Sequence, residues 1–321
     1  MTRIYGFSLL RNGVKYDYPF RESLASLLGL TEGVWLALGK SEDGTEEEVA
    51  RMSGLHVKPT IWDENLRQEG VILSQQTNLA LAFLRESHPS GWGFYLQADE
   101  VLLESEFNQI HRDLEQAEHE GCDAVSFRYL HFWQSYDRLA YARRWYPEEV
   151  RAIRLDSPIE SYSDAQGFRH HRKIFHSNCH IYHYGHVREA TAYERKKSDF
   201  HRWWHTDEEM RKRISAAKAS DAEEPTLAWH GPHPNCMNER RGAPPRLPRR
   251  SVLVYGEHTD LPRGFWARVN ADLSFTLDVD RVSSHDPADV VLLRNLPLWR
   301  RLFSRPPVPR GMLWKGSRPW E

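Results

Sequence analysis

Apolar runs that suit buried strands alternate with amphipathic runs that suit helices over the first hundred residues. The strand-like runs cover residues 4–10, 33–39, 55–62 and 93–101, and helical spacing recurs over 20–30, 46–52 and 74–87. Thr45 is expected to cap the second helix, which opens with three glutamates. Repeated strand–helix–strand units predict a parallel sheet with helices on both faces, and a binding crevice at the carboxyl ends of its strands. Asp43 and Asp99 both fall at such ends.

The middle of the chain mixes strands and helices. We expect a polar helix over 107–120, a strand over 123–133, an Arg-rich strand pair over 143–155 and an alternating strand over 173–188. In the alternating strand, His183 falls on the apolar face. Four other histidines predict a surface patch, with zinc binding as the alternative: His170, His171, His176 and His180.

A Pro- and Arg-rich stretch, "RRGAPPRLPRR", follows a charged helical segment and has the composition of a linker. It predicts a domain over 1–240, a linker over 241–250 and a small α/β segment over 251–321. About 70 residues is short for an independent domain. The sequence leaves open whether the chain is a piece of a longer protein.

Charge and cysteine content exclude several classes. Lys plus Arg number 43 and Asp plus Glu number 45, so no overall field favours nucleic acid or an anionic membrane. Cys122, Cys179 and Cys236 lie far apart without CxxC spacing, which argues against disulfides and a zinc cluster and favours a reducing cytoplasm. No apolar run approaches the roughly 20 residues of a membrane span, and the N-terminus is no signal peptide. Contact with a membrane surface stays open. Twelve Trp and thirteen Tyr suit a well-filled core, or stacking on sugars and bases.

The run "GFYLQADEVL" ends a buried strand on two adjacent carboxylates, Asp99 and Glu100. Burying two charges is costly unless something compensates them. Oxygen ligands such as Asp99 suit Mg²⁺ or Mn²⁺, which commonly bridge carboxylates to the phosphates of a nucleotide. A strand end with solvated acids is the alternative.

A resemblance favours the first interpretation. In the motifs "GFSLLRNGVKYDYPFRESLASLL", "LGKSEDGTEEEV", "QQTNLAL", "GFYLQADEVL" and "IYHYGHVR", residues 3–235 resemble bacterial family 2 glycosyltransferases, which have the A-type nucleotide-sugar fold. That fold is a Rossmann-like mixed sheet with helices on both faces. The resemblance implies a nucleotide-sugar donor, and it does not specify the sugar.

The resemblance also implies roles for single residues. Asp43 would contact the base or ribose of the nucleotide, and otherwise it closes a turn. Asn78 would lie close to the nucleotide, and otherwise it caps locally. Gln97 stands where these enzymes carry the first acid of an Asp-x-Asp motif, while Asp99 keeps the metal position. The lost charge leaves the strictness of the metal requirement open.

His183 resembles a late histidine that joins the metal shell in some A-fold enzymes, although an inward histidine can also be a satisfied core residue. An inverting transferase needs a general base for the acceptor hydroxyl. We assign it to Asp164, about 65 residues after Asp99, with Asp156 and Glu160 as competitors.

The leaving diphosphate has to be neutralised by a metal or by arginines. The segment "RRWYPEEVR" offers Arg143, Arg144 and Arg151, and pairing with Glu148 and Glu149 is the alternative.

The tail weakly resembles the first half of α-1,3-fucosyltransferases, in "FTLDVDRVSSHDPADVVLLRNLP" and "RPPVPRGMLWKGSRPWE". If so, it starts a second transferase domain and lacks the donor-binding half.

The whole sequence thus predicts a cytoplasmic, metal-assisted, inverting glycosyltransferase that uses Mn²⁺ or Mg²⁺. Its acceptor would be a saccharide or glycolipid of cell-surface polysaccharide or lipopolysaccharide synthesis. A nucleotidyltransferase would need a Gly-rich phosphate loop, which "LLRNGVKYD" is not. A non-catalytic carbohydrate- or nucleotide-binding module is the other alternative, and it would explain the Trp content and the lost acid.

Overall fold

The computed structural model describes residues 2–63, 65–66, 70–140, 145–189, 191–192, 195–196, 226–229, 231–242, 292–294 and 312–314. Its helices are α1 (Phe20–Leu30), α2 (Thr45–Ala50), α3 (Val71–Ser87), α4 (Phe107–His119) and α7 (Asn238–Arg241), with short turns η1 (Glu104–Glu106) and η2 (Asn235–Met237). The strands are β1 (Ile4–Leu10), β2 (Val34–Gly39), β3 (Leu55–Thr60), β4 (Trp92–Tyr95), β5 (Glu100–Leu102), β6 (Ala124–Trp133), β7 (Arg138–Ala140), β8 (Glu148–Arg154), β9 (Glu160–Ser161), β10 (Phe168–Arg169), β11 (Ile174–His186), β12 (Thr226–Ala228), β13 (Leu292–Arg294) and β14 (Met312–Trp314).

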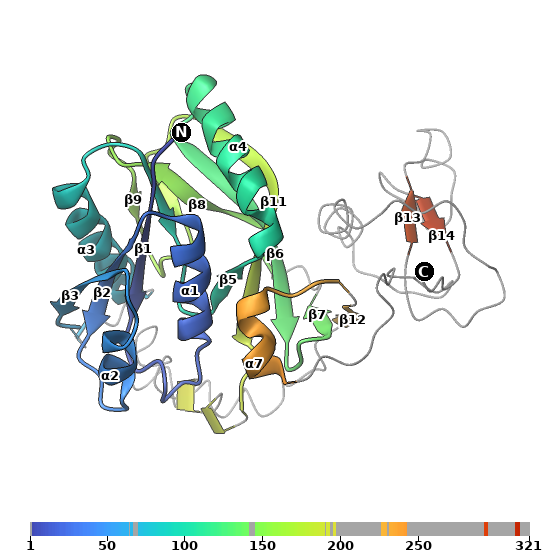
Figure 1. The fold of residues 1–321 in the computed structure, drawn as a ribbon, viewed down its shortest axis with the longest axis horizontal. Coiled ribbons are helices and arrows are strands. Elements are labelled where there is room, and N and C mark those ends of the chain that lie inside the picture. The colour runs from blue at the N-terminus through green and yellow to red at the C-terminus, as the bar shows by residue number, and fades with distance from the viewer. Residues whose placement is uncertain are drawn as a thin grey trace.

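Within these residues one mixed sheet of ten strands forms the scaffold (Figure 1). Its main path runs β12-β7-β6-β8-β4-β1-β2-β3, and β11 pairs with both β6 and β5. The predicted mixed α/β architecture is confirmed. The βαβ pattern alone predicted a parallel sheet, and that was wrong for β8, which runs antiparallel between β4 and β6. After β4 the chain passes through α4 and forms β6 two positions away in the sheet. β8 then occupies the position between β4 and β6. The carboxyl ends of β1, β2, β4, β6 and β11 therefore meet at one edge.

Helices cover both faces of the sheet because each presents an apolar side. On one face, Leu24 and Leu27 of α1 and Leu114 of α4 pack into the same core cluster. A Cβ on Gly6 of β1 would lie 2.7 Å from Leu27, so glycine lets α1 approach the sheet closely. On the other face Leu81 of α3 packs with aromatic residues of β1 and β4.

Most elements of the first hundred residues lie within a few residues of their predicted places. The strand predicted over 93–101 is wrong beyond Tyr95, because a turn separates β4 from β5 there. Three further local predictions were wrong. Thr45 is the first residue of α2 and does not precede it, and Asp43 accepts its N–H at 3.1 Å. In 145–155 the structure has one strand, β8, and residues 143–144 lie outside the described part. His180, expected on the surface, is fully buried, because both faces of β11 are covered from Cys179 onward and Glu106 Oε1 lies 3.0 Å from His180 Nδ1.

No helix among the described residues is long and apolar enough to cross a bilayer. In the tail, the described residues form one antiparallel pair, β13 with β14. The division at 241–250 stays a prediction, because residues 243–291 lie outside the described part of the chain.

A chain truncated after Arg249 should keep the melting temperature of the first domain. Residues 226–242 contribute the buried Trp229 and Met237, and the Arg240 guanidinium donates to the Asp17 carbonyl at 2.7 Å. A chain truncated after Pro225 loses these contacts and should melt several degrees lower. Thermal unfolding followed by circular dichroism compares the two. Aggregation of the chain that ends at Arg249 would show that the tail belongs to the first domain.

Candidate active site

A pocket opens at the carboxyl edge of the sheet, where β1 and β4 end. It measures about 520 Å³ including its open mouth. Its walls are largely aromatic and apolar, and its polar groups are Arg11, Gln97, Asp99 and tyrosine hydroxyls. The lining residues are Leu9, Leu10, Arg11, Tyr16, Tyr18, Trp62, Leu73, Tyr95, Gln97, Ala98 and Asp99. Apolar walls with a few convergent polar groups are typical of a small-molecule site.

One wall of the pocket is the loop after β1, which carries Tyr16 and Tyr18. Asp43 holds this loop, because its Oδ2 accepts the Lys15 N–H at 2.5 Å while its Oδ1 accepts the Thr45 hydroxyl at 2.6 Å. Asp43 therefore holds the loop in place without lining the pocket itself. Its contact with a base or ribose stays a prediction. Across the pocket, the Arg11 guanidinium lies 5.4 Å from the Trp62 ring centroid.

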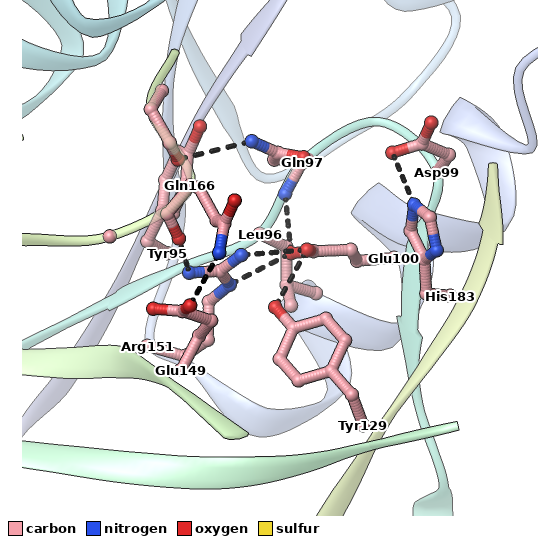
Figure 2. A network of polar contacts seen from close by, with 12 residues as sticks. Tyr95, Leu96, Gln97, Asp99, Glu100, Tyr129, Glu149, Arg151, Gln166 and His183 are labelled. Atoms are coloured by element: carbon pink, nitrogen blue, oxygen red, sulfur yellow. Dashed lines mark hydrogen bonds and ion pairs between the residues drawn. The ribbon is translucent and has the colours of Figure 1, made fainter. Parts of the chain in front are cut away.

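The floor is the turn from Gln97 to Glu100, whose two acids have separate partners. Glu100 is fully buried and binds Arg151, whose Nη2 donates to Oε1 at 2.8 Å and whose Nε donates to Oε2 at 3.0 Å (Figure 2). Its Oε2 also accepts the Gln97 N–H at 3.0 Å, and its Oε1 accepts the Tyr129 hydroxyl at 2.7 Å. Burial alone would lower the pKa of Arg151, but Glu100 raises it well above its ordinary value. Glu100 is thus a structural acid.

Asp99 is 5% exposed and points away from Glu100. Its Oδ2 lies 3.3 Å from Lys196 Nζ and 3.5 Å from Arg188 Nη2. Burial would raise the pKa of Asp99, but Lys196, His183 and Arg188 hold it well below its usual range. Both cations also lie over the Tyr18 ring, each 4.7 Å from its centroid. Two positive side chains thus converge on one carboxylate beside the pocket.

Burial lowers the pKa of Lys196 to about 8, helped by Arg188 and opposed by Asp99. The Arg188 side chain is fully buried, and Nη1 donates to the Tyr16 carbonyl at 2.8 Å. Its Nε has no hydrogen-bond acceptor among the described residues. A buried donor without an acceptor costs about 1–3 kcal/mol, so a ligand oxygen at this position would stabilise the site.

His183 is 8% exposed, and its Nε2 lies 3.9 Å from Asp99 Oδ1. The structure thus brings together the two residues to which the resemblance assigns a metal, and the metal role itself stays a prediction. A carboxylate oxygen and an imidazole nitrogen fit Mn²⁺ better than Mg²⁺, which prefers oxygen alone. Among the described residues no group of three His, Cys, Asp or Glu side chains could hold a metal. The pair therefore fits a divalent ion only if ligand oxygens and water complete its shell.

Asp164 lies on a loop that the floor of the pocket holds in place. Gln97 Nε2 donates to the Ala165 carbonyl at 3.1 Å, and Arg151 Nη1 donates to the Gln166 carbonyl at 2.7 Å. Ala165 has a left-handed backbone, with φ of 60°. Burial raises the pKa of the half-buried Asp164, which suits a general base better than a solvated aspartate does.

The other end of the Asp164 loop is attached to α3. Asn78 Nδ2 donates to the Ser161 carbonyl at 2.9 Å, and its Oδ1 accepts the Ser161 N–H at 2.8 Å. The Asn78 amide thus binds a loop residue 83 positions away, and it does not line the pocket. Its contact with a nucleotide, implied by the resemblance, has no support in this geometry.

The competitors for the general base differ in their surroundings. Asp156 pairs with Arg154 at 3.1 Å and Glu160 with Arg169 at 2.6 Å, both at exposed positions. Hydrogen bonds from these arginines lower the pKa of both acids. Glu149 is a competitor that sequence reasoning missed: burial raises its pKa, and Gln166 Nε2 donates to it at 2.6 Å.

Of the arginines assigned to the diphosphate, the structure describes only Arg151. Arg151 is buried on Glu100 and does not line the pocket, and Arg144 lies outside the described residues. Arg188 and Lys196 are the cations beside Asp99. Only Arg188 had a sequence signal, since it ends the motif "IYHYGHVR".

The predicted histidine patch is wrong at one of its four positions. His170 and His176 are exposed and His171 is half-buried, but the buried His180 has its Nδ1 3.0 Å from Glu106 Oε1. No zinc cluster forms among the described residues.

A scan of family models and a search of curated proteins found no match. Among solved structures the chain is similar to TarS of S. aureus, with a TM-score of 0.36 and 13% identity over 61% of this chain and 39% of TarS. TarS 1–349 in complex with UDP-GlcNAc gives a TM-score of 0.29 and 14% identity, over 40% of this chain and 34% of that chain. A nucleotide-diphospho-sugar transferase of Desulfovibrio desulfuricans G20 gives a TM-score of 0.33 and 9% identity, over 64% of this chain and 100% of that chain. The chain spans less than two thirds of TarS, and all three TM-scores are below 0.5, so the site has to be judged from its own side chains.

Replacing Arg151 with Met should lower the free energy of unfolding by about 3–5 kcal/mol, because Glu100 would stay buried without its partner. The double variant Glu100→Gln with Arg151→Met should recover much of that loss. Urea unfolding at neutral pH measures both. A double variant no more stable than Arg151→Met would contradict the assignment of this pair.

Proposed function

We propose that this chain is an inverting glycosyltransferase that moves a sugar from a nucleotide-sugar donor to a saccharide or glycolipid acceptor. The observation that carries the proposal is the buried Arg188 next to Asp99, an acid that lines the aromatic pocket. The Nε of Arg188 has no acceptor among the described residues. A phosphate oxygen is the acceptor that suits a guanidinium best. The leaving diphosphate would therefore bind where Arg188 and Lys196 converge.

The aromatic end of the pocket suits the base of the nucleotide. Tyr16 and Trp62 line it, and the Arg11 guanidinium stacks near Trp62. Stacking of a base on an aromatic ring contributes about 1–3 kcal/mol and tolerates different bases. The pocket thus accounts for a nucleotide and leaves the choice of base open.

Asp99 Oδ1 and His183 Nε2 would hold the divalent ion, Mn²⁺ or Mg²⁺. When bound, the ion would neutralise the negative charge that develops on the diphosphate as the sugar leaves. Gln97 contributes no charge because its side chain is a neutral amide, and this amide holds the loop at Ala165. In an enzyme with an acid at this position, that acid would help to bind the metal ion. Here Arg188 and Lys196 supply positive charge for the diphosphate instead.

Asp164 is proposed as the general base that takes the proton from the acceptor hydroxyl during in-line attack on the anomeric carbon. Gln97, which lines the pocket, binds the residue next to it. Inversion follows from a single displacement with one base. An acceptor from cell-surface polysaccharide or lipopolysaccharide synthesis belongs to the proposal through the family resemblance alone. A cytoplasmic location belongs to it through the cysteine content.

Arg188→Met should weaken the binding of the preferred nucleoside diphosphate by about 10- to 100-fold, because it removes a buried charge-assisted donor. Isothermal titration with UDP, GDP, dTDP and CDP first identifies that nucleotide on the natural chain. Arg112→Met is the matched control, because Arg112 is an exposed residue of α4 that contacts only Gln109 in the described part of the chain. Equal affinities of the two variants would contradict the phosphate role, and no binding by the natural chain would overturn the proposed function.

Asp164→Asn should lower kcat by about 10²- to 10⁴-fold while donor affinity stays within twofold. The natural enzyme should gain activity as pH rises through the elevated pKa of Asp164, and the variant should lose that dependence. Glu160→Gln, which alters a surface pair, is the control and should keep normal turnover. Steady-state rates of nucleotide release, measured over a range of pH, give kcat and its pH dependence. Loss of turnover in Glu149→Gln instead would move the base to Glu149.

A further inference from the structure

Two histidines on neighbouring strands connect a backbone carbonyl to the candidate metal position. His131 Nε2 lies 2.8 Å from the Tyr146 carbonyl oxygen, and His131 Nδ1 lies 3.0 Å from His183 Nδ1. His183 Nε2 then faces Asp99 Oδ1 at 3.9 Å. His131 and His183 are directly opposite in the β6–β11 register, which places their side chains on the same face of the sheet.

The positions of the protons follow from these contacts. A carbonyl oxygen only accepts, so His131 Nε2 carries a proton. A neutral imidazole carries one proton, so the Nδ1 of the buried His131 is a lone pair. The 3.0 Å contact between the two Nδ1 atoms needs one proton, which therefore lies on His183. A neutral His183 then presents a lone pair at Nε2.

That lone pair faces a carboxylate oxygen. Two acceptors 3.9 Å apart do not attract each other, but both can bind a cation placed between them. If His183 were released from His131, its single proton could move to Nε2 and bind Asp99 directly. The same two side chains would then form an ion-free pair and not a metal site.

We propose that His131 is a positioning residue that fixes His183 as the Nδ1–H tautomer and so makes Nε2 a metal ligand beside Asp99. The inference rests on the proposed function for the identity of the cation, and on hydrogen-bond geometry for the tautomer. Partners of metal-binding histidines commonly change metal affinity by about 10- to 100-fold.

The test uses the full chain labelled with ¹⁵N-histidine and the chemical shifts of the imidazole nitrogens. His183→Gln identifies the His183 signals. In the natural chain His183 should show a protonated Nδ1 and a bare Nε2. A protonated Nε2 in the natural chain would overturn the proposal without any variant.

Two substitutions of His131 then separate positioning from folding. His131→Phe keeps a flat ring without an acceptor, so His183 should change to the Nε2–H form and Mn²⁺ affinity should fall about 10- to 100-fold. His131→Asn can place an amide oxygen near the former Nδ1, so it should keep the natural tautomer and most of the affinity. Electron paramagnetic resonance measures the Mn²⁺ affinity with UDP present. An unchanged tautomer in His131→Phe, or equal Mn²⁺ loss in both variants, would contradict the role.

UDP binding in EDTA separates this proposal from the function it rests on. Both His131 variants should bind UDP as the natural chain does without metal, because Arg188 and Lys196 are intact. If the natural chain binds no nucleoside diphosphate, the proposed function fails, while the tautomer is still decided by the ¹⁵N shifts. If the nucleotide binds and the tautomer is the opposite one, only the role of His131 fails.

Discussion

The buried ion pair of Glu100 with Arg151 is the interaction on which the rest of the site depends. Both side chains are fully buried, which would be costly without two hydrogen bonds between them and further partners at Gln97, Tyr129 and Gln166. The pair ties the turn after β4 to the loop of Asp164. One acid of the "ADE" motif thus fixes the geometry, and the other, Asp99, is left to face the pocket.

Charge balance around Asp99 then decides what the pocket can bind. Arg188 and Lys196 approach one oxygen of the carboxylate, and His183 faces the other. The two oxygens thus have different roles. In the proposed function, one oxygen organises the cations that bind the diphosphate, and the other would form half of a metal position. Under that proposal the same arrangement would compensate for Gln97 in place of a first acid.

The sequence predicted well what depends on local pattern. Strands and helices up to β4 and the inward direction of His183 follow from periodicity, whereas the turn at Gln97 falls inside the strand predicted over 93–101. The meeting of Asp99 and His183 came from the resemblance. What the sequence could not show depends on tertiary partners: the Ser161 backbone that binds Asn78, the Glu100 that binds Arg151, and the elements that cover both faces of β11 around His180. No pattern near Lys196 marks it, because only the fold brings it within 3.3 Å of Asp99.

A crystal structure of the chain with Mn²⁺ and the nucleoside diphosphate that it binds best tests the central claim most directly. The account predicts a diphosphate in contact with Arg188 and Lys196, a base between the aromatic walls of the pocket, and an anomalous Mn²⁺ signal between Asp99 Oδ1 and His183 Nε2. A nucleotide bound elsewhere on the chain, with no phosphate oxygen in contact with Arg188 or Lys196, would contradict it.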